Sequence, residues 1–137
     1  MAVADVVRLL GTNPVYRSRV ACHNIADPEP AAYGTLDRPL PDPLAAYLAH
    51  AGIRLYTHQC EAVNLLREEK NVIITTPTAS GKTLAFNLPV FECMDSDPDA
   101  RALYLYPTKA LANDQHRTLL AMEKFTGISV KPAIYDG

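Results

Sequence analysis

The stretch from Thr76 to Thr83, Thr-Pro-Thr-Ala-Ser-Gly-Lys-Thr, has the residue types and spacing best suited to chemistry in this sequence. Its last part matches the phosphate-loop pattern GxxxxGK followed by Ser or Thr, with Thr76 at the position of the first glycine. Small residues let consecutive backbone N–H groups close around a phosphate at the start of a helix, whose dipole also favours anions. The stretch therefore predicts a loop that binds the phosphates of a nucleotide.

The residues of this loop have distinct expected roles. Lys82 would reach the β- and γ-phosphates as a point charge, and Thr83 would place its hydroxyl on a Mg²⁺ ion that bridges the same phosphates. These two are the expected catalytic residues, and Thr83 is the expected metal ligand. The other expected nucleotide-binding positions of the loop are Thr78, Ala79, Ser80 and Gly81. The alternative interpretation is an ordinary strand-to-helix turn in which a lysine begins the helix.

The flanking residues predict the elements that position this loop. Val72 to Thr75 is β-branched throughout, as expected of a strand that is covered on both faces. Further predicted elements are a helix from about Lys82 to Met94, a strand from Ala102 to Tyr106, a helix from Thr108 to about Lys124 and a third strand from Ile128 to Tyr135. This alternation predicts an α/β fold of right-handed βαβ units with a parallel sheet. Ligands of such sheets bind beyond the carboxyl ends of the strands, where the loop lies.

The chain before the loop is expected to be organised differently. Prolines concentrated between Pro28 and Pro43 fix φ and remove backbone donors, which predicts an extended arm. The predicted helices here run from Val3 to Leu10, ended by Gly11 and Pro14, from Leu44 to Ala51, ended by Gly52, and from an N-cap at Thr57 to about Leu66. We therefore divide the chain into an N-terminal arm, residues 1–43, and a lobe, residues 44–137.

Composition sets the broad class of protein. The chain of 137 residues is 48% hydrophobic and 20% charged, with a net charge of -2, so any nucleic-acid site must be local. No run reaches membrane-spanning length and no signal peptide is evident, which favours a cytoplasmic protein without a membrane partner. The three cysteines are expected to be reduced, buried thiols, and the four histidines to be surface or packing residues. Tyr104 and Tyr106 are expected to pack in the core.

Three stretches resemble motifs of superfamily 2 helicases. Thr76 to Thr83 is similar to their first motif, in which Ala or Thr commonly replaces the first glycine. Leu55-Tyr56-Thr57-His58-Gln59 resembles the Q motif, and the stretch from Pro107 to Gln115 is similar to motif Ia. The combination most resembles the DEAD/DEAH-box branch that includes the Hrq and MrfA-type DNA-repair helicases. The resemblance covers about residues 44–137 and implies the N-terminal part of a RecA-like P-loop NTPase lobe, with flanking helices and a preceding proline-rich arm.

The resemblance also implies site residues outside the phosphate loop. Gln59 would read adenine, since a side-chain amide can donate and accept a hydrogen bond at once. Arg54 and Tyr56 would stack on the base or flank it. Thr108 and Lys109 would contact the phosphate backbone of a nucleic-acid strand. Gly137 lies where relatives continue into another loop that contacts this backbone.

The implied activity is that of an ATP-dependent helicase that binds ATP with Mg²⁺ and acts on nucleic acid, with DNA the expected substrate. Hydrolysis in this family also needs an acidic box and a second RecA-like lobe, and neither occurs in these 137 residues. We therefore expect this chain alone to be inactive. The alternatives are a P-loop NTPase of another class, such as a small-molecule kinase or GTPase, and a non-catalytic nucleotide- or nucleic-acid-binding module.

Overall fold

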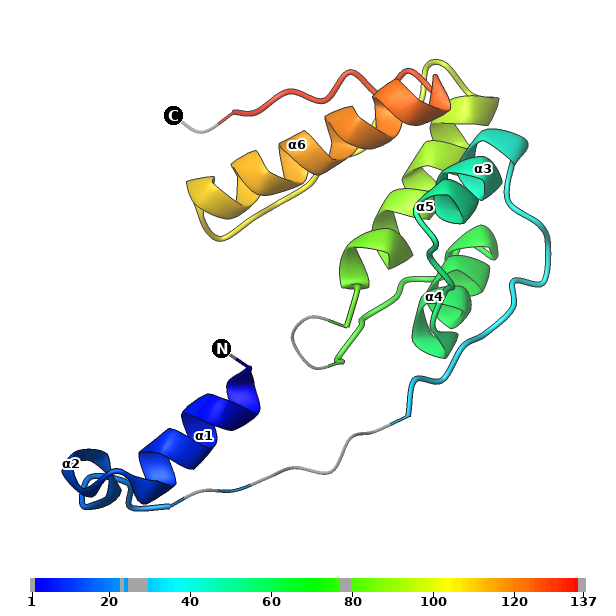
Figure 1. The fold of residues 1–137 in the computed structure, drawn as a ribbon. Coiled ribbons are helices and arrows are strands. Elements are labelled where there is room, and N and C mark those ends of the chain that lie inside the picture. The colour runs from blue at the N-terminus through cyan, green and yellow to red at the C-terminus, as the bar shows by residue number, and fades with distance from the viewer. Residues whose placement is uncertain (1, 23, 25–29, 77–79, 136–137) are drawn as a thin grey trace. The chain divides into compact units, whose positions relative to one another are not determined.

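The computed structural model describes residues 2–22, 24, 30–76 and 80–135. The chain divides into two compact units, a smaller unit of residues 1–30 and a larger unit of residues 31–137. The helices of the described residues are α1 (Val3–Thr12), α2 (Pro14–Arg17), α3 (Asp42–His50), α4 (Thr57–Arg67), α5 (Lys82–Ser96) and α6 (Lys109–Thr126) (Figure 1).

The smaller unit contains one helix that was predicted and one that was not. The helix α1 begins at Val3 as expected but continues through Gly11 to Thr12, so Gly11 does not end it. Asn13 then accepts a hydrogen bond from the backbone N–H of Val15 at 2.9 Å and caps α2, in which Pro14 is the first residue. This Asn-Pro pair is a favourable helix start. A helix of only four residues leaves no periodic pattern from which to predict it.

In the larger unit, the predicted helices are confirmed, with shifted ends. The helix α3 begins at Asp42, because proline is tolerated in the first turn, where its missing N–H has no intrahelical partner. The N-cap of α4 is Tyr56 rather than Thr57. Thr108 caps α6 and accepts a hydrogen bond from the backbone N–H of Leu111 at 3.2 Å.

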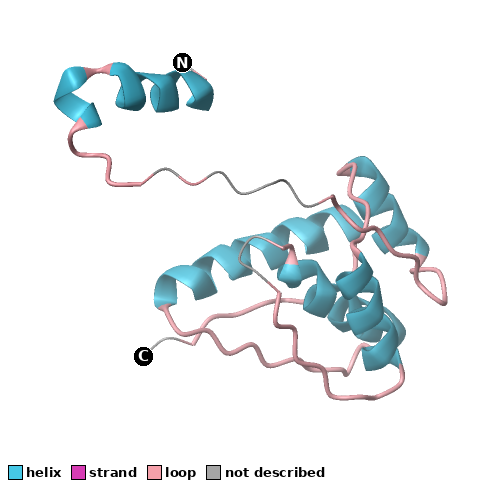
Figure 2. Cartoon of the chain, turned by 90° about the horizontal axis from the view of Figure 1, so that it is seen from below, coloured by secondary structure: helices cyan, strands magenta, loops and turns pink. Residues whose placement is uncertain are grey.

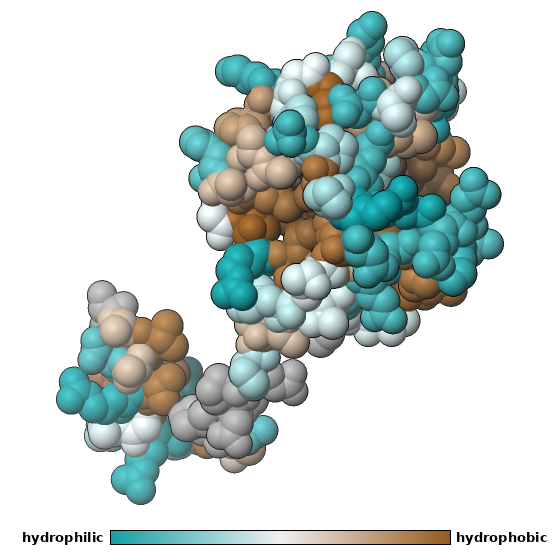
Figure 3. Space-filling model, turned by 90° about the vertical axis from the view of Figure 1, so that its right-hand side faces the viewer, coloured by the Kyte–Doolittle hydropathy of each residue, from teal (hydrophilic) through white to brown (hydrophobic). Residues whose placement is uncertain are grey.

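The core of the larger unit lies between two pairs of helices. The helix α4 packs on α5, and α3 packs on α6, where the ring of Phe125 meets the rings of Tyr47 and His50. The buried core residues are Leu44, Leu48, Leu55, Cys60, Val63, Leu88, Phe91, Leu119, Met122 and Ile128. Hydrophobic residues also lie at the surface of both units (Figure 3).

The segments expected to be strands form no sheet within the described part of the chain. Residues 71–76, 101–106 and 128–135 run outside helices and appear as loops in Figure 2. The expectation that Val72 to Thr75 is covered on both faces is wrong here, since Ile73 is 91% exposed. Leu103 and Leu105 are 84% and 83% exposed. A strand requires neighbouring strands for its backbone hydrogen bonds, so the parallel sheet stays a prediction.

Residues 101–106 nevertheless alternate in the way a strand does. Leu103 and Leu105 are exposed, whereas Tyr104 and Tyr106 are partly buried and stack with ring centroids 6.1 Å apart. The hydroxyl of Tyr104 donates to Oδ1 of Asn87, which is fully buried on α5, at 3.1 Å. The expected packing of Tyr104 against the core is confirmed.

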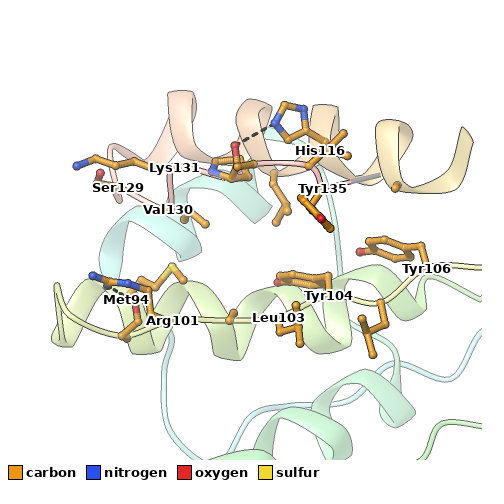
Figure 4. Close-up of a pocket in the computed structure, with 18 of the residues that line it drawn as sticks. Met94, Arg101, Leu103, Tyr104, Tyr106, His116, Ser129, Val130, Lys131 and Tyr135 are labelled. Atoms are coloured by element: carbon orange, nitrogen blue, oxygen red, sulfur yellow. Dashed lines mark hydrogen bonds between the residues drawn. The ribbon is translucent and has the colours of Figure 1, made fainter. Parts of the chain in front are cut away.

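A cavity of about 1140 Å³ is lined by residues of the segments 101–106 and 128–135 and of α6 (Figure 4). On its α6 side, His116 Nε2 donates to the Pro132 carbonyl at 3.0 Å. This contact ties the final segment to α6.

Residues 31–41 run outside helices, with a bend at residues 37 and 38, and they are bound to the residues around the start of α4. The backbone N–H of Gly34 donates to Leu55 O at 3.0 Å, and that of Thr57 donates to Ala32 O at 3.0 Å. A Cβ atom at Gly34 would lie 3.0 Å from the Thr57 Cα, so a larger residue would have to push this close approach apart.

A largely buried ion pair holds the next part of the arm. Arg67 Nε donates to Glu92 Oε2 at 3.0 Å, and the Arg67 guanidinium also donates to the carbonyls of Arg38 and Pro39, at 2.8 and 3.4 Å. Arg67 therefore joins α4, α5 and the segment that leads into α3.

The cysteines agree only partly with expectation. All three are free thiols, but Cys22 and Cys93 are exposed and only Cys60 is buried. Burial raises the pKa of the Cys60 thiol.

Each helix of the described residues is too short or too polar to cross a membrane.

Candidate functional site

The start of α5 provides the geometry of an anion site. Gly81 precedes the helix with φ of 74°, a left-handed conformation that favours glycine, and α5 begins at Lys82. The first N–H groups of a helix lack intrahelical acceptors and point out of its N-terminus, where the helix dipole favours anions. The expected positions Thr78 and Ala79 lie outside the described residues.

The side chain of Lys82 turns back into the loop. Its Nζ atom donates to Thr76 O at 2.6 Å, to Ser80 Oγ at 3.2 Å and to Thr76 Oγ1 at 3.3 Å. The two hydroxyls also bond to each other, with Thr76 Oγ1 and Ser80 Oγ 2.6 Å apart. The ammonium group therefore lies among the loop's oxygen atoms at the positive end of α5.

Thr83 is the second residue of α5 and is partly buried. Among the described residues, no cluster of three His, Cys, Asp or Glu side chains is arranged to hold a metal ion. Thr83 could offer its neutral hydroxyl to Mg²⁺, a ligand that suits a cation held jointly with phosphate oxygens. The role of Thr83 as a metal ligand stays a prediction.

Gln59 joins the start of α4 to the phosphate loop. Its side chain is only 2% exposed, its Oε1 accepts from the backbone N–H of Tyr56 at 2.8 Å, and its Nε2 donates to Gly81 O at 2.6 Å. Both ends of the amide are therefore engaged within the protein. Reading of adenine by Gln59 stays a prediction, and it would require exchange of these hydrogen bonds for bonds to the base.

Arg54 and Tyr56 belong to a stack of side chains beside Gln59. The rings of Tyr33 and Tyr56 are stacked with centroids 5.4 Å apart, and the guanidinium of Arg54 lies 4.0 Å from the Tyr33 centroid. On the other side, the ring of Tyr56 stacks with that of His58 at 5.8 Å. The expected base-flanking residues are thus brought together, although their contact with a base stays a prediction.

Sequence reasoning missed two members of this stack. His58 was expected to be a surface or packing residue, yet its Nε2 lies 3.0 Å from the Ser80 carbonyl. Its position directly before Gln59 was a usable signal. Tyr33 was part of the arm, and its contact with Tyr56 is a pairing that no local pattern predicts.

The predicted nucleic-acid residues lie at the start of α6. Thr108 is the N-cap and Lys109 is the first helical residue, and both line the cavity described above. Both residues are exposed. Gly137 lies outside the described residues. Binding of a strand by these residues stays a prediction.

Comparison with known proteins gives a consistent family. A family model described as DEAD/DEAH box helicase matches residues 56–137. The chain is 45% identical over 105 residues to the uncharacterized ATP-dependent helicase YprA of Bacillus subtilis, covering 73% of this chain and 14% of that protein. It is 38% identical over 111 residues to the ATP-dependent helicase hrq1 of Schizosaccharomyces pombe, covering 78% of this chain and 10% of that protein.

Solved structures agree with these relatives. The crystal structure of the DUF1998 helicase MrfA bound to DNA matches with a TM-score of 0.83 and 36% identity, covering 100% of this chain and 19% of that one. The structure of MrfA bound to DNA and AMPPNP matches with a TM-score of 0.81 and 34% identity. The chain therefore spans less than a fifth of the length of each of these proteins.

Proposed function

The chain belongs to the DEAD/DEAH box helicase family, and from that premise we propose that it is the front part of a longer ATP-dependent DNA helicase. The observation that carries the proposal is the position of Lys82, whose ammonium lies inside the loop that leads into α5. A cation at the N-terminus of a helix, among small and hydroxyl residues, suits an anionic ligand such as the phosphates of a nucleotide.

In this proposal the residues of the loop bind and orient the triphosphate of ATP. Lys82 exchanges its contacts with Thr76 and Ser80 for phosphate oxygens, and Thr83 supplies a hydroxyl to Mg²⁺. When bound, Mg²⁺ neutralises charge on the phosphates. The carboxylates and the second lobe that hydrolysis requires would come from the remainder of the protein, in agreement with the small share of its relatives that this chain spans.

The proposed nucleic-acid partner is DNA. Support comes from MrfA, which has been solved bound to DNA and to DNA with AMPPNP. Lys109 at the first position of α6 would contact a backbone phosphate as a point charge, next to the N-cap Thr108. By the sequence resemblance alone, we extend the proposal to a role in DNA repair.

The proposed fold is a RecA-like lobe in which the three extended segments are strands of a parallel sheet. The exposed aliphatic side chains of the first two segments, Ile73, Leu103 and Leu105, would be covered by further elements of the complete protein. The alternation along residues 101–106 and the likeness to MrfA support this proposal.

Replacement of Lys82 tests the ATPase part of the proposal. In the complete protein, Lys82→Ala should abolish DNA-stimulated ATP turnover, because it removes the charge that neutralises the γ-phosphate. Lys124→Ala, at an exposed lysine in the last turn of α6, is the matched control and should leave turnover unchanged. Retained turnover in Lys82→Ala would refute the assignment.

The same assay decides between the proposal and its alternatives. Equal turnover of GTP and ATP would favour an NTPase of another class, whereas nucleotide binding without turnover would favour a non-catalytic module.

The salt dependence of DNA affinity tests Lys109. Loss of one phosphate contact in Lys109→Ala should make the slope of log affinity against log salt shallower by about one unit, with little dependence on DNA sequence. An unchanged slope would remove Lys109 from the DNA site.

A further inference from the structure

Two consecutive side chains of α4 bind two consecutive carbonyls of the phosphate loop. His58 Nε2 lies 3.0 Å from Ser80 O, and Gln59 Nε2 lies 2.6 Å from Gly81 O. Since a carbonyl oxygen can only accept, the Nε2 atom of His58 must carry a proton and donate it. The first turn of α4 therefore holds the loop at two adjacent peptide groups.

These bonds fix the direction of two N–H groups. The peptide bonds of the described residues are trans, and in a trans peptide the C=O and N–H groups point in opposite directions. When His58 holds the carbonyl of Ser80, the N–H of Gly81 points away from α4. The bond from Gln59 does the same for the N–H of Lys82. Both N–H groups belong to the start of α5, where an anion would be bound.

The imidazole of His58 is itself held in place. It stacks on Tyr56 with an angle of 14° between the rings, and Tyr56 stacks on Tyr33, also at 14°. Arg54 lies over the ring of Tyr33. A ring fixed in this way presents its N–H in one direction, so little ordering is required when the loop binds a ligand.

We propose that His58 is a positioning residue for nucleotide binding, which orients the Gly81 N–H toward the phosphates through the Ser80 carbonyl. The inference rests on the function proposed above and adds a residue that the sequence did not assign to the site. The effect of its hydrogen bond is on the phosphates, because the carbonyl that it holds belongs to the phosphate loop.

A pair of substitutions separates the hydrogen bond from the packing of the ring. His58→Phe keeps an aromatic ring to stack on Tyr56 but removes the donor, and His58→Gln keeps a donor but removes the ring. In the complete protein, His58→Phe should weaken ADP and ATP about 3- to 10-fold, the value expected for one hydrogen bond, and His58→Gln should weaken them less. Adenosine affinity should be unchanged in His58→Phe, which keeps the ring that stacks on Tyr56. Displacement of a fluorescent ADP analogue measures all three ligands.

His116→Phe is the matched control, since His116 also donates to a backbone carbonyl at 3.0 Å, but on α6. It should leave nucleotide affinity unchanged. Three results would overturn the inference: unchanged ATP affinity in His58→Phe, an equal loss of ATP and adenosine affinity in His58→Phe, or a greater loss of ATP affinity in His58→Gln than in His58→Phe. Absence of ATP binding by the unsubstituted protein would instead refute the proposed function, and the inference with it.

Discussion

Replacing Gly81 with alanine tests the contact between the phosphate loop and α4. A Cβ atom at Gly81 would lie 2.6 Å from Gln59 Nε2, so the Gln59 amide would have to move. Gly127 has the same φ of 74°, but nothing lies within 4 Å of its Cβ position. A left-handed alanine costs about 1–2 kcal/mol at either position, so Gly127→Ala measures this strain alone.

The additional loss at Gly81 comes from Gln59. A displaced amide loses its bonds to Gly81 O and to the N–H of Tyr56, each of which contributes roughly 0.5–1.5 kcal/mol. The free energy of unfolding of Gly81→Ala should therefore fall below that of Gly127→Ala by about 1–3 kcal/mol.

Urea denaturation of the two variants without nucleotide, followed by the circular dichroism of the helices, measures this difference. A double-mutant cycle assigns it to the contact: in a Gln59→Ala background, the additional loss at Gly81 should disappear. Equal destabilisation by Gly81→Ala and Gly127→Ala would refute the reasoning, since the Gln59 amide would then not occupy the space beside Gly81.

Two further predictions concern buried groups. Glu92→Ala removes the carboxylate partner of the largely buried Arg67 guanidinium and should lower the free energy of unfolding by about 3 kcal/mol. The same urea denaturation measures this loss. Glu68→Ala, in an exposed ion pair with Lys70, is the control and should have no measurable effect. Because burial raises the pKa of Cys60, its thiolate fraction at pH 8 is reduced. Iodoacetamide should therefore modify the exposed Cys22 before Cys60, as followed by mass spectrometry. Equal modification rates of the two thiols would contradict this prediction.

The helices could be predicted because their signals are local. Apolar residues three and four apart, Gly52 after α3 and Thr108 before α6 mark helices of nine or more residues without knowledge of the rest of the fold. The errors are of one or two residues and follow from the same local chemistry, as when proline is accepted in the first turn of α3. The four residues of α2 are too few for such a pattern.

The remaining features depend on contacts between residues far apart in the sequence. A strand is stabilised by its neighbours, so the β-branched stretch from Val72 to Thr75 predicts a strand that the described residues alone do not form. The bonds of His58 and Gln59 to the loop join residues 22 positions apart, and a motif indicates only one of these two residues. The sequence thus indicates Gln59, but neither His58 nor the hydrogen bonds by which both side chains hold the loop.

The close approach of residues 31–41 to α4 has a practical consequence for anyone who shortens this protein. A version that starts at Asp42, where the first helix of the larger unit begins, would lose the Gly34 backbone that covers Cys60. It would also lose the carbonyls of Arg38 and Pro39, which accept hydrogen bonds from Arg67. The ring of Tyr33, which stacks with that of Tyr56, would be lost as well. Expression of the larger unit should therefore start no later than Ala31, even though residues 31–41 contain no helix.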